Sequence, residues 1–77
     1  MTPATRRRLY AACLAGNMPA EALPPADRER LVDELWAAGW TDVEIATHIH
    51  MSTYTTARIR ARLGVPPNTA QARKKLA

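Results

Sequence analysis

Prolines and glycines divide this chain of 77 residues into short segments, and the positions of these helix-breaking residues limit the folds that it can adopt. Proline inside a helix removes a backbone donor and costs about 3 kcal/mol, and glycine commonly ends a helix. Fifteen alanines favour helix between these residues, whereas valine and isoleucine together number only six and no stretch alternates cleanly between apolar and polar residues. The chain is therefore predicted to be all-α, a small bundle of about four helices.

Capping signals locate the expected helices. Thr2 before Pro3 is a good N-cap, and so is Ser52. Thr41 with Glu44 three residues later matches the capping box. The expected elements are a helix from Pro3 to about Ala15, a weakly signalled turn over 19–23, and helices from the Pro24–Pro25 pair to Gly39, from Asp42 to about Ile49 and from Thr53 to Leu63.

Helical spacing predicts which side chains face the interior. The chain has no Phe, so we expect Trp36 and Trp40 to fill the core. A single cysteine, Cys13, cannot form an internal disulfide and is expected to be a small buried hydrophobe in a reduced, intracellular protein. The other predicted inward positions are Leu9 and Ala12 in the first helix and Leu31, Val32, Leu35 and Ala38 in the second.

The length predicts one domain and argues against an enzyme. A chain of this size buries only roughly 60% of its unfolded surface, which leaves little room for a deep substrate cleft. The acidic residues show no paired carboxylates in a dry setting and are interpreted as caps and surface groups, namely Asp27, Asp33, Glu34 and Glu44. We expect no cofactor. The single domain 1–77 divides into an N-terminal helix and turn (1–23), a core (24–64) and a basic tail (65–77).

The segment from the third to the fourth expected helix carries the functional signal. Two short helices joined by a tight turn, with Ala46 small enough for a close crossing, match the requirements of a helix-turn-helix. Apolar residues suited to the junction are Ile45, Ile49, Met51 and Ile59. The fourth helix keeps an outward face of donors that suit base edges and phosphates. We therefore place a helix-turn-helix in residues 24–64.

These residues resemble a known superfamily. The string from Ala37 to Ala46, followed by Ile49, Met51-Ser52 and Thr55, is similar to the helix-turn-helix of LuxR-type response-regulator output domains and of sigma-factor region 4. The resemblance covers about residues 35–64 and implies a tetrahelical DNA-binding fold. The Ala- and Arg-rich composition also resembles that of small regulators of actinobacteria and their phages. His50 stands where the family usually has Gly, which implies a left-handed backbone at a non-glycine residue.

The predicted contacts separate into two groups. Base edges are assigned to Thr53, Tyr54 and Arg58, near the start of the proposed recognition helix, because Arg can bond bidentately to guanine. The alternative for the arginines is a solvated helix face. Phosphate contacts are assigned to Ser52, Thr55, Arg60, Arg62, Arg73, Lys74 and Lys75.

The charge distribution supports double-stranded DNA as the partner. Net charge is +4, yet from Arg58 onward six basic residues and no acid occur, so the excess is C-terminal. The basic run Arg6–Arg8 precedes only four apolar residues before Cys13, fewer than the roughly 7–15 of a signal peptide. We expect no membrane partner and a cytoplasmic, nucleoid-associated location.

Several alternatives remain open at this level. A homodimer through the first helix would use Leu9, Tyr10 and Leu14. The Arg6–Arg8 run would serve as plain surface, as a phosphate contact, as an arm into a neighbouring DNA groove or as a partner contact. The main competing function is a protein-interaction module that docks on RNA polymerase or a recombinase through its Trp residues or first helix. RNA binding is a weaker alternative because no platform of exposed aromatic residues is present. The His48-x-His50 pair is not expected to bind metal.

Overall fold

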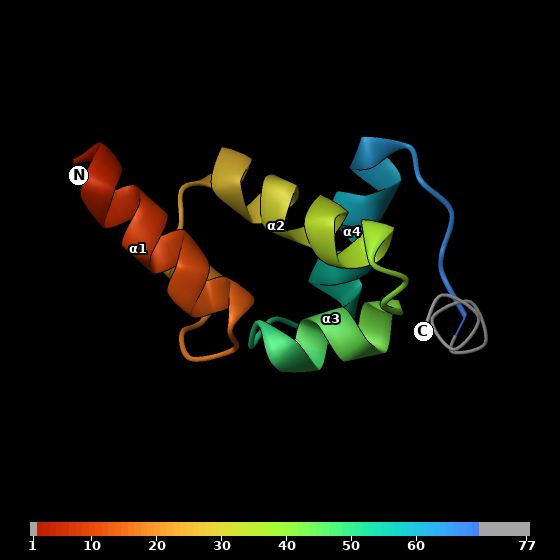
Figure 1. Ribbon diagram of the computed structural model, residues 1–77. Coiled ribbons are helices and arrows are strands. Elements are labelled where there is room, and N and C mark those ends of the chain that lie inside the picture. Colours follow the sequence, from red (N-terminus) through yellow and green to blue (C-terminus); the bar gives the residue numbers. More distant parts are fainter. Residues whose placement is uncertain (1, 70–77) are drawn as a thin grey trace.

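A computed structural model describes residues 2–69, and in this range the chain forms helices and no strand. Figure 1 shows α2 between α1 and α4, with α3 below α2 and the end of α3 close to the end of α1. The all-α prediction is confirmed. None of the helices described is long and apolar enough to cross a membrane. The elements are α1 (Pro3–Leu14), the 3-10 turn η1 (Ala20–Ala22), α2 (Pro25–Ala37), α3 (Asp42–His48) and α4 (Thr53–Leu63).

The predicted caps account for these boundaries. The Thr2 hydroxyl accepts a hydrogen bond from the Thr5 amide at 3.1 Å and begins α1. The capping box is complete, since the Thr41 hydroxyl accepts from the Glu44 amide and the Glu44 carboxylate accepts from the Thr41 amide. Each such cap contributes about 1 kcal/mol, which matters most for a helix as short as α3.

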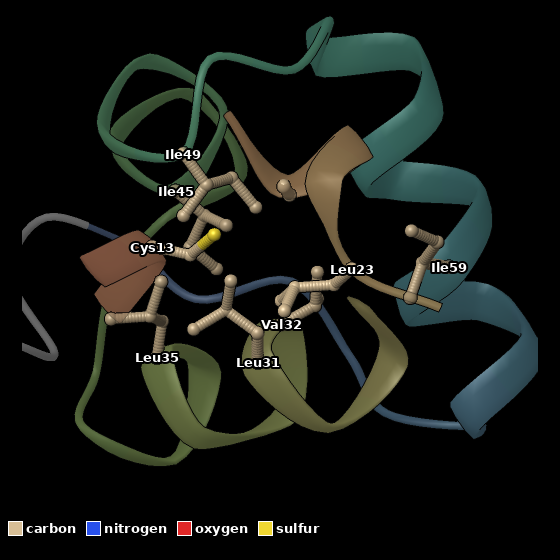
Figure 2. Close-up of a cluster of buried hydrophobic side chains, with 9 residues drawn as sticks. Cys13, Leu23, Leu31, Val32, Leu35, Ile45, Ile49 and Ile59 are labelled. Carbon is tan, nitrogen blue, oxygen red and sulfur yellow. The ribbon is translucent and has the colours of Figure 1, made fainter. Parts of the chain in front are cut away.

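A single apolar core joins all the elements. Figure 2 shows Cys13 from α1, Leu23 after η1 and the α2 side chains converging on Ile45 of α3, Ile49 just after α3 and Ile59 of α4. Trp36 and Trp40 are only partly buried and pack against the edge of this core, so the prediction that they fill it is confirmed only in part. Burial raises the pKa of the Cys13 thiol, so it stays protonated and packs as a hydrophobe. One prediction is wrong: Ala38 is exposed, because α2 ends at Ala37 and the chain turns through Gly39.

Two histidines join the end of α1 to the end of α3. His48 Nε2 lies 2.6 Å from the Leu14 carbonyl oxygen, and His50 Nε2 lies 3.2 Å from the Gly16 carbonyl oxygen. The His48 ring also meets Trp40 edge-on, with the ring centroids 4.8 Å apart. The Leu14 carbonyl belongs to the last turn of α1 and the Gly16 carbonyl comes just after it, where no helical partner is available. The histidines therefore act as a tertiary C-cap.

Substitution of Gly16 by Ala is expected to destabilise the protein more than the same change at Gly64. Both glycines have positive φ, +82° and +77°, which costs an L-residue about 1–2 kcal/mol. A Cβ atom at Gly16 would also lie 2.8 Å from His48 Cε1, whereas one at Gly64 meets nothing within 4 Å. Urea unfolding of the two variants measures the difference. Equal losses would show that the His48 ring moves aside freely.

Polar contacts, as well as apolar ones, fasten α1 to α2. Asp27 accepts from Arg6 Nε at 3.1 Å and Nη2 at 2.9 Å, and its side chain is only 9% exposed. The Tyr10 hydroxyl donates to Glu34 at 2.6 Å. Asp27 is thus not the surface or capping group that the sequence predicted. Its short side chain lies on the α2 face that meets α1, where Arg6 of α1 is its hydrogen-bonded partner and Arg30 of α2 adds a weaker electrostatic attraction.

The apolar residues of α1 that were expected to form a homodimer interface make contacts within the chain. Leu9, Tyr10 and Leu14 are partly buried and pack against the core. The side of α1 that remains exposed carries mainly Ala and Arg side chains. A two-fold interface through α1 would therefore combine the exposed parts of the apolar stripe with these Ala and Arg side chains.

The Asp27–Arg6 ion pair makes part of the stability depend on pH. The hydrogen bond from Arg6 holds the pKa of Asp27 below its ordinary value of 3.8. The pair therefore stabilises the fold fully above about pH 5, and this contribution is lost as the pH falls through the unfolded and then the lower folded pKa. We expect Asp27→Asn to flatten the fall in stability between pH 5 and about pH 2. Thermal unfolding followed by circular dichroism measures this slope, and an unchanged slope would contradict the assignment.

Candidate nucleic-acid interface

Helix α4 presents one side to solvent and buries the other. Ile59 and Thr56 are buried and anchor the helix against α2 and α3. Tyr54 is 71% exposed, and Arg58 and Arg62 lie on the same exposed side. This alternation follows from the helical repeat, since residues four apart share a face. The exposed face of α4, hereafter the α4 face, consists of Tyr54, Thr55, Arg58, Ala61 and Arg62.

The turn before α4 has the backbone geometry that the sequence predicted. His50 has φ +57°, the left-handed conformation expected at that position, and it is the non-glycine residue with positive φ in the described chain. Left-handed backbone is uncommon for a residue with a side chain, and His tolerates it better than most. The hydrogen bond between His50 and the Gly16 carbonyl oxygen helps to hold the turn.

The first turn of α4 is closed by its own hydroxyl groups. Ser52 Oγ accepts from the Thr55 amide at 3.0 Å and donates to the Thr55 hydroxyl at 2.8 Å. The Thr56 hydroxyl donates to the Ser52 carbonyl oxygen. The cap leaves the amides of Thr53 and Tyr54 without helical acceptors. Ser52 and Thr55 therefore serve first as caps, and the amides beside them are the groups that can meet an anion.

The three arginines of α4 differ in their partners. Arg60 Nε donates to both carboxylate oxygens of Asp42 in α3, its Nη1 donates to the Val65 carbonyl oxygen, and its side chain is 15% exposed. Arg62 pairs with Glu29 of α2 at 2.8 Å but is 62% exposed. Arg58 forms no ion pair within residues 2–69, and its guanidinium carbon lies 5.8 Å from the centre of the Tyr54 ring.

These partners decide what each arginine can contact. Arg60 lies off the α4 face and ties α4 to α3, so a phosphate contact would require breaking that ion pair. The exposed pair of Arg62 is worth only about 0.2–1 kcal/mol and exchanges readily for another anion. Arg58 projects from the middle of the face beside Tyr54 and is available without any exchange. Sequence reasoning placed all three on one helix but had no means of assigning their partners.

A segment after α4 holds the end of α2, and sequence reasoning did not find it. Trp36 Nε1 donates to the Pro66 carbonyl oxygen at 2.6 Å. Asn68 Nδ2 donates to the Trp36 carbonyl oxygen at 2.7 Å and to the Trp40 carbonyl oxygen at 3.1 Å. These bonds satisfy carbonyls at the end of α2. Three predicted phosphate contacts lie beyond this segment, outside the described residues: Arg73, Lys74 and Lys75.

A shallow groove adjoins the α4 face. It has a volume of about 380 Å³ and lies between the start of α2 and the turn before α4. Met51 and Ile59 contribute apolar lining, while Arg28 and Arg62 contribute positive charge against Glu29. The described residues contain no group of three side chains suited to a metal ion. Glu21 also lines the groove, so its two arginines face two acidic residues, and the groove extends the hydroxyl-lined start of α4 toward α2 without adding net positive charge.

Comparison with known proteins found no relative of this chain. No family model matches the chain, and neither the curated proteins nor the solved structures contain a match.

Proposed function

We propose that this protein binds double-stranded DNA in a sequence-specific manner, with α4 in the major groove. It would act as a small transcription regulator or as a phage-type repressor or excision factor on the nucleoid. An α-helix fits the major groove, where each base pair presents a distinct pattern of donors and acceptors. Base contacts are assigned to Tyr54 and Arg58, with Thr53 at the start of the helix.

The observation that carries this proposal is the state of Arg58. Of the three arginines on α4, it is the one without a carboxylate partner, and it stands beside a Tyr that is 71% exposed. An unpaired guanidinium in the middle of an exposed helix face is well placed for bidentate bonds to guanine. The Tyr54 ring restricts where that guanidinium moves, which lowers the entropy lost on binding.

Phosphate contacts would surround this centre. Arg62 would exchange Glu29 for a phosphate at small cost, and the amides of Thr53 and Tyr54 form the positive end of the helix dipole. The predicted contacts by Arg73, Lys74 and Lys75 would add charge from the C-terminal tail. Such contacts fix the register of a protein on DNA without reading its sequence.

One unit of this size reads only a few base pairs, so useful specificity requires a dimer, tandem binding or a second contact. Selection of bound duplexes from a random pool, with the purified 77-residue chain, tests the proposal directly. A palindromic enriched site would indicate a homodimer, and a direct repeat would indicate tandem binding. Absence of any enriched sequence would contradict sequence-specific binding.

A second candidate is a protein-interaction module that docks on RNA polymerase or a recombinase. Val43 is 61% exposed and lines a small surface hollow with Trp40 and His48. Apolar side chains grouped on a surface mark partner sites more often than isolated ones do. Three results together would favour this function. The protein would bind a protein partner at high salt, Val43→Asp would abolish that binding, and no DNA binding would be detected.

A further inference from the structure

A second group of arginines surrounds a hollow between α1 and α2. Arg6 and Arg7 of α1 and Arg30 of α2 line it, together with Pro3 and Asp27. We call these three arginines the α1–α2 cluster. The sequence showed the run of arginines in α1 but gave no reason to connect it with Arg30, which lies on another helix.

The α1–α2 cluster is positively charged and partly held in place. Arg6 is fixed by two bonds to Asp27, which neutralises that carboxylate and leaves Arg6 Nη1 free. The Arg30 guanidinium lies over the Tyr10 ring, 4.3 Å from its centre. Arg7 forms no ion pair or hydrogen bond in the described part of the chain. Two arginine charges around the hollow therefore have no carboxylate of their own.

The cluster works against the stability of α1. Its first turn carries no acidic residue, and arginines follow at the end of the helix where the dipole is positive. Acidic residues are favoured there, as in the first turn of α3. Asp27 compensates Arg6, but Arg7 and Arg30 have no ion-pair partner in the described residues, and a local rule left without compensation is typical of a functional site. An anion bound in the hollow would supply the missing compensation.

The cluster also lies on the other side of α2 from α4. Asp27 holds Arg6 of α1, and Glu29 holds Arg62 of α4. These two acidic residues are two positions apart on one helix, which places them about 200° apart around its axis. Figure 1 agrees, with α1 at the left of the view and α4 behind the right-hand part of α2. A straight duplex against the α4 face therefore does not reach the cluster.

We propose that the α1–α2 cluster binds the phosphate backbone of a second DNA segment, so that one molecule joins two duplexes. The inference rests on the proposed function, which puts the first duplex on α4. Each strand of a duplex carries one negative charge about every 3.4 Å of helix axis. A row of phosphates can therefore pair with several neighbouring arginines at once, whereas a single carboxylate cannot. Planar guanidinium groups also match phosphate oxygens in pairs. Contacts of this kind read no sequence, so the second segment has no sequence requirement.

The test uses a duplex with the selected site on beads and a fluorescent duplex of unrelated sequence in solution. We expect the wild-type protein to retain the fluorescent duplex, and Arg7→Glu to reduce that retention by about tenfold at low salt. Arg8→Glu is the matched control. It makes the same charge change on the same helix, and Arg8 does not line the hollow. Affinity of each variant for the single selected site is measured in parallel and is expected to stay unchanged.

The outcomes separate the inference from the function on which it rests. If the wild-type protein binds no duplex, the proposed function is wrong and the inference falls with it. If it binds the selected site but retains no second duplex, only the inference is overturned. Equal retention of the fluorescent duplex by Arg7→Glu and Arg8→Glu would attribute the joining to a dimer. If Arg7→Glu lost as much affinity for the single selected site as it lost retention, the cluster would lie on the first duplex. Displacement by poly-glutamate as effective as that by unlabelled DNA would indicate an acidic protein partner instead. Each of these last three results overturns the inference.

Discussion

Replacement of Arg58 by Ala is expected to weaken binding to the selected DNA site by about 1–3 kcal/mol, or about 5- to 150-fold in Kd. The reason is that Arg58 carries the unpaired guanidinium in the middle of the α4 face. Binding to random DNA is expected to change little, because that binding depends mainly on phosphate contacts. Fluorescence anisotropy with both duplexes over a range of salt concentrations measures the two affinities.

Arg62→Ala provides the matched comparison on the same helix. Arg62 is paired with Glu29 and is proposed to contact phosphate. Its loss is therefore expected to weaken binding to all sequences alike and to lower the slope of log K against log salt by about 1. Equal losses on specific and random DNA for Arg58→Ala would refute the assignment of Arg58 to a base. If Arg62→Ala lost specificity and Arg58→Ala did not, Arg62 would contact a base and Arg58 a phosphate.

Ile45→Ala is expected to produce the largest loss of stability, about 2–5 kcal/mol. Ile45 is fully buried where α3 meets the rest of the core, as Figure 2 shows. A chain of this length has a total stability of roughly 4–12 kcal/mol, so the change removes a large share of it. Because α3 and its turn hold the start of α4, DNA affinity is expected to fall together with the folded fraction.

Val43→Ala is the control for this change, since Val43 is on the same helix but 61% exposed. It loses the same kind of apolar side chain with almost no burial, and its effect is expected to stay within about 0.5 kcal/mol. Urea unfolding of both variants gives the comparison. A similar loss for Val43→Ala would mean that this side chain is buried against a partner in solution, and it would strengthen the interaction-module alternative.

The helices could be predicted well because their end signals are local. Thr2, the Thr41–Glu44 pair and Ser52 each act within four residues of the chain, so their caps formed as predicted. The left-handed turn at His50 was expected from the resemblance, since His50 stands where the helix-turn-helix family usually has Gly, and the structure has it. Ala38 was the failure, since helical spacing was extended past the residue at which α2 ends.

The candidate site was only half predictable. The sequence placed Tyr54, Arg58 and Arg62 on one exposed face, because residues four apart on a helix share a side. It treated Arg60 as one more phosphate contact, whereas Asp42 and the Val65 carbonyl hold it inside the fold. Which arginine is paired depends on acidic residues 18 or 33 positions away in the chain, and no local pattern reports such distances.

The sequence by itself determined where helices begin and end, which side of each is apolar, and that positive charge collects from Arg58 onward. These follow from capping, helical period and composition, all of which act over a few residues. Only the tertiary structure decided which charges remain unpaired. It placed Asp27 against Arg6 and Glu29 against Arg62 on opposite sides of α2, and among residues 2–69 it left Arg58 and Arg7 without an ion-pair partner. Pairing is a contact between distant segments, so the surfaces available to DNA appear only once the helices are packed.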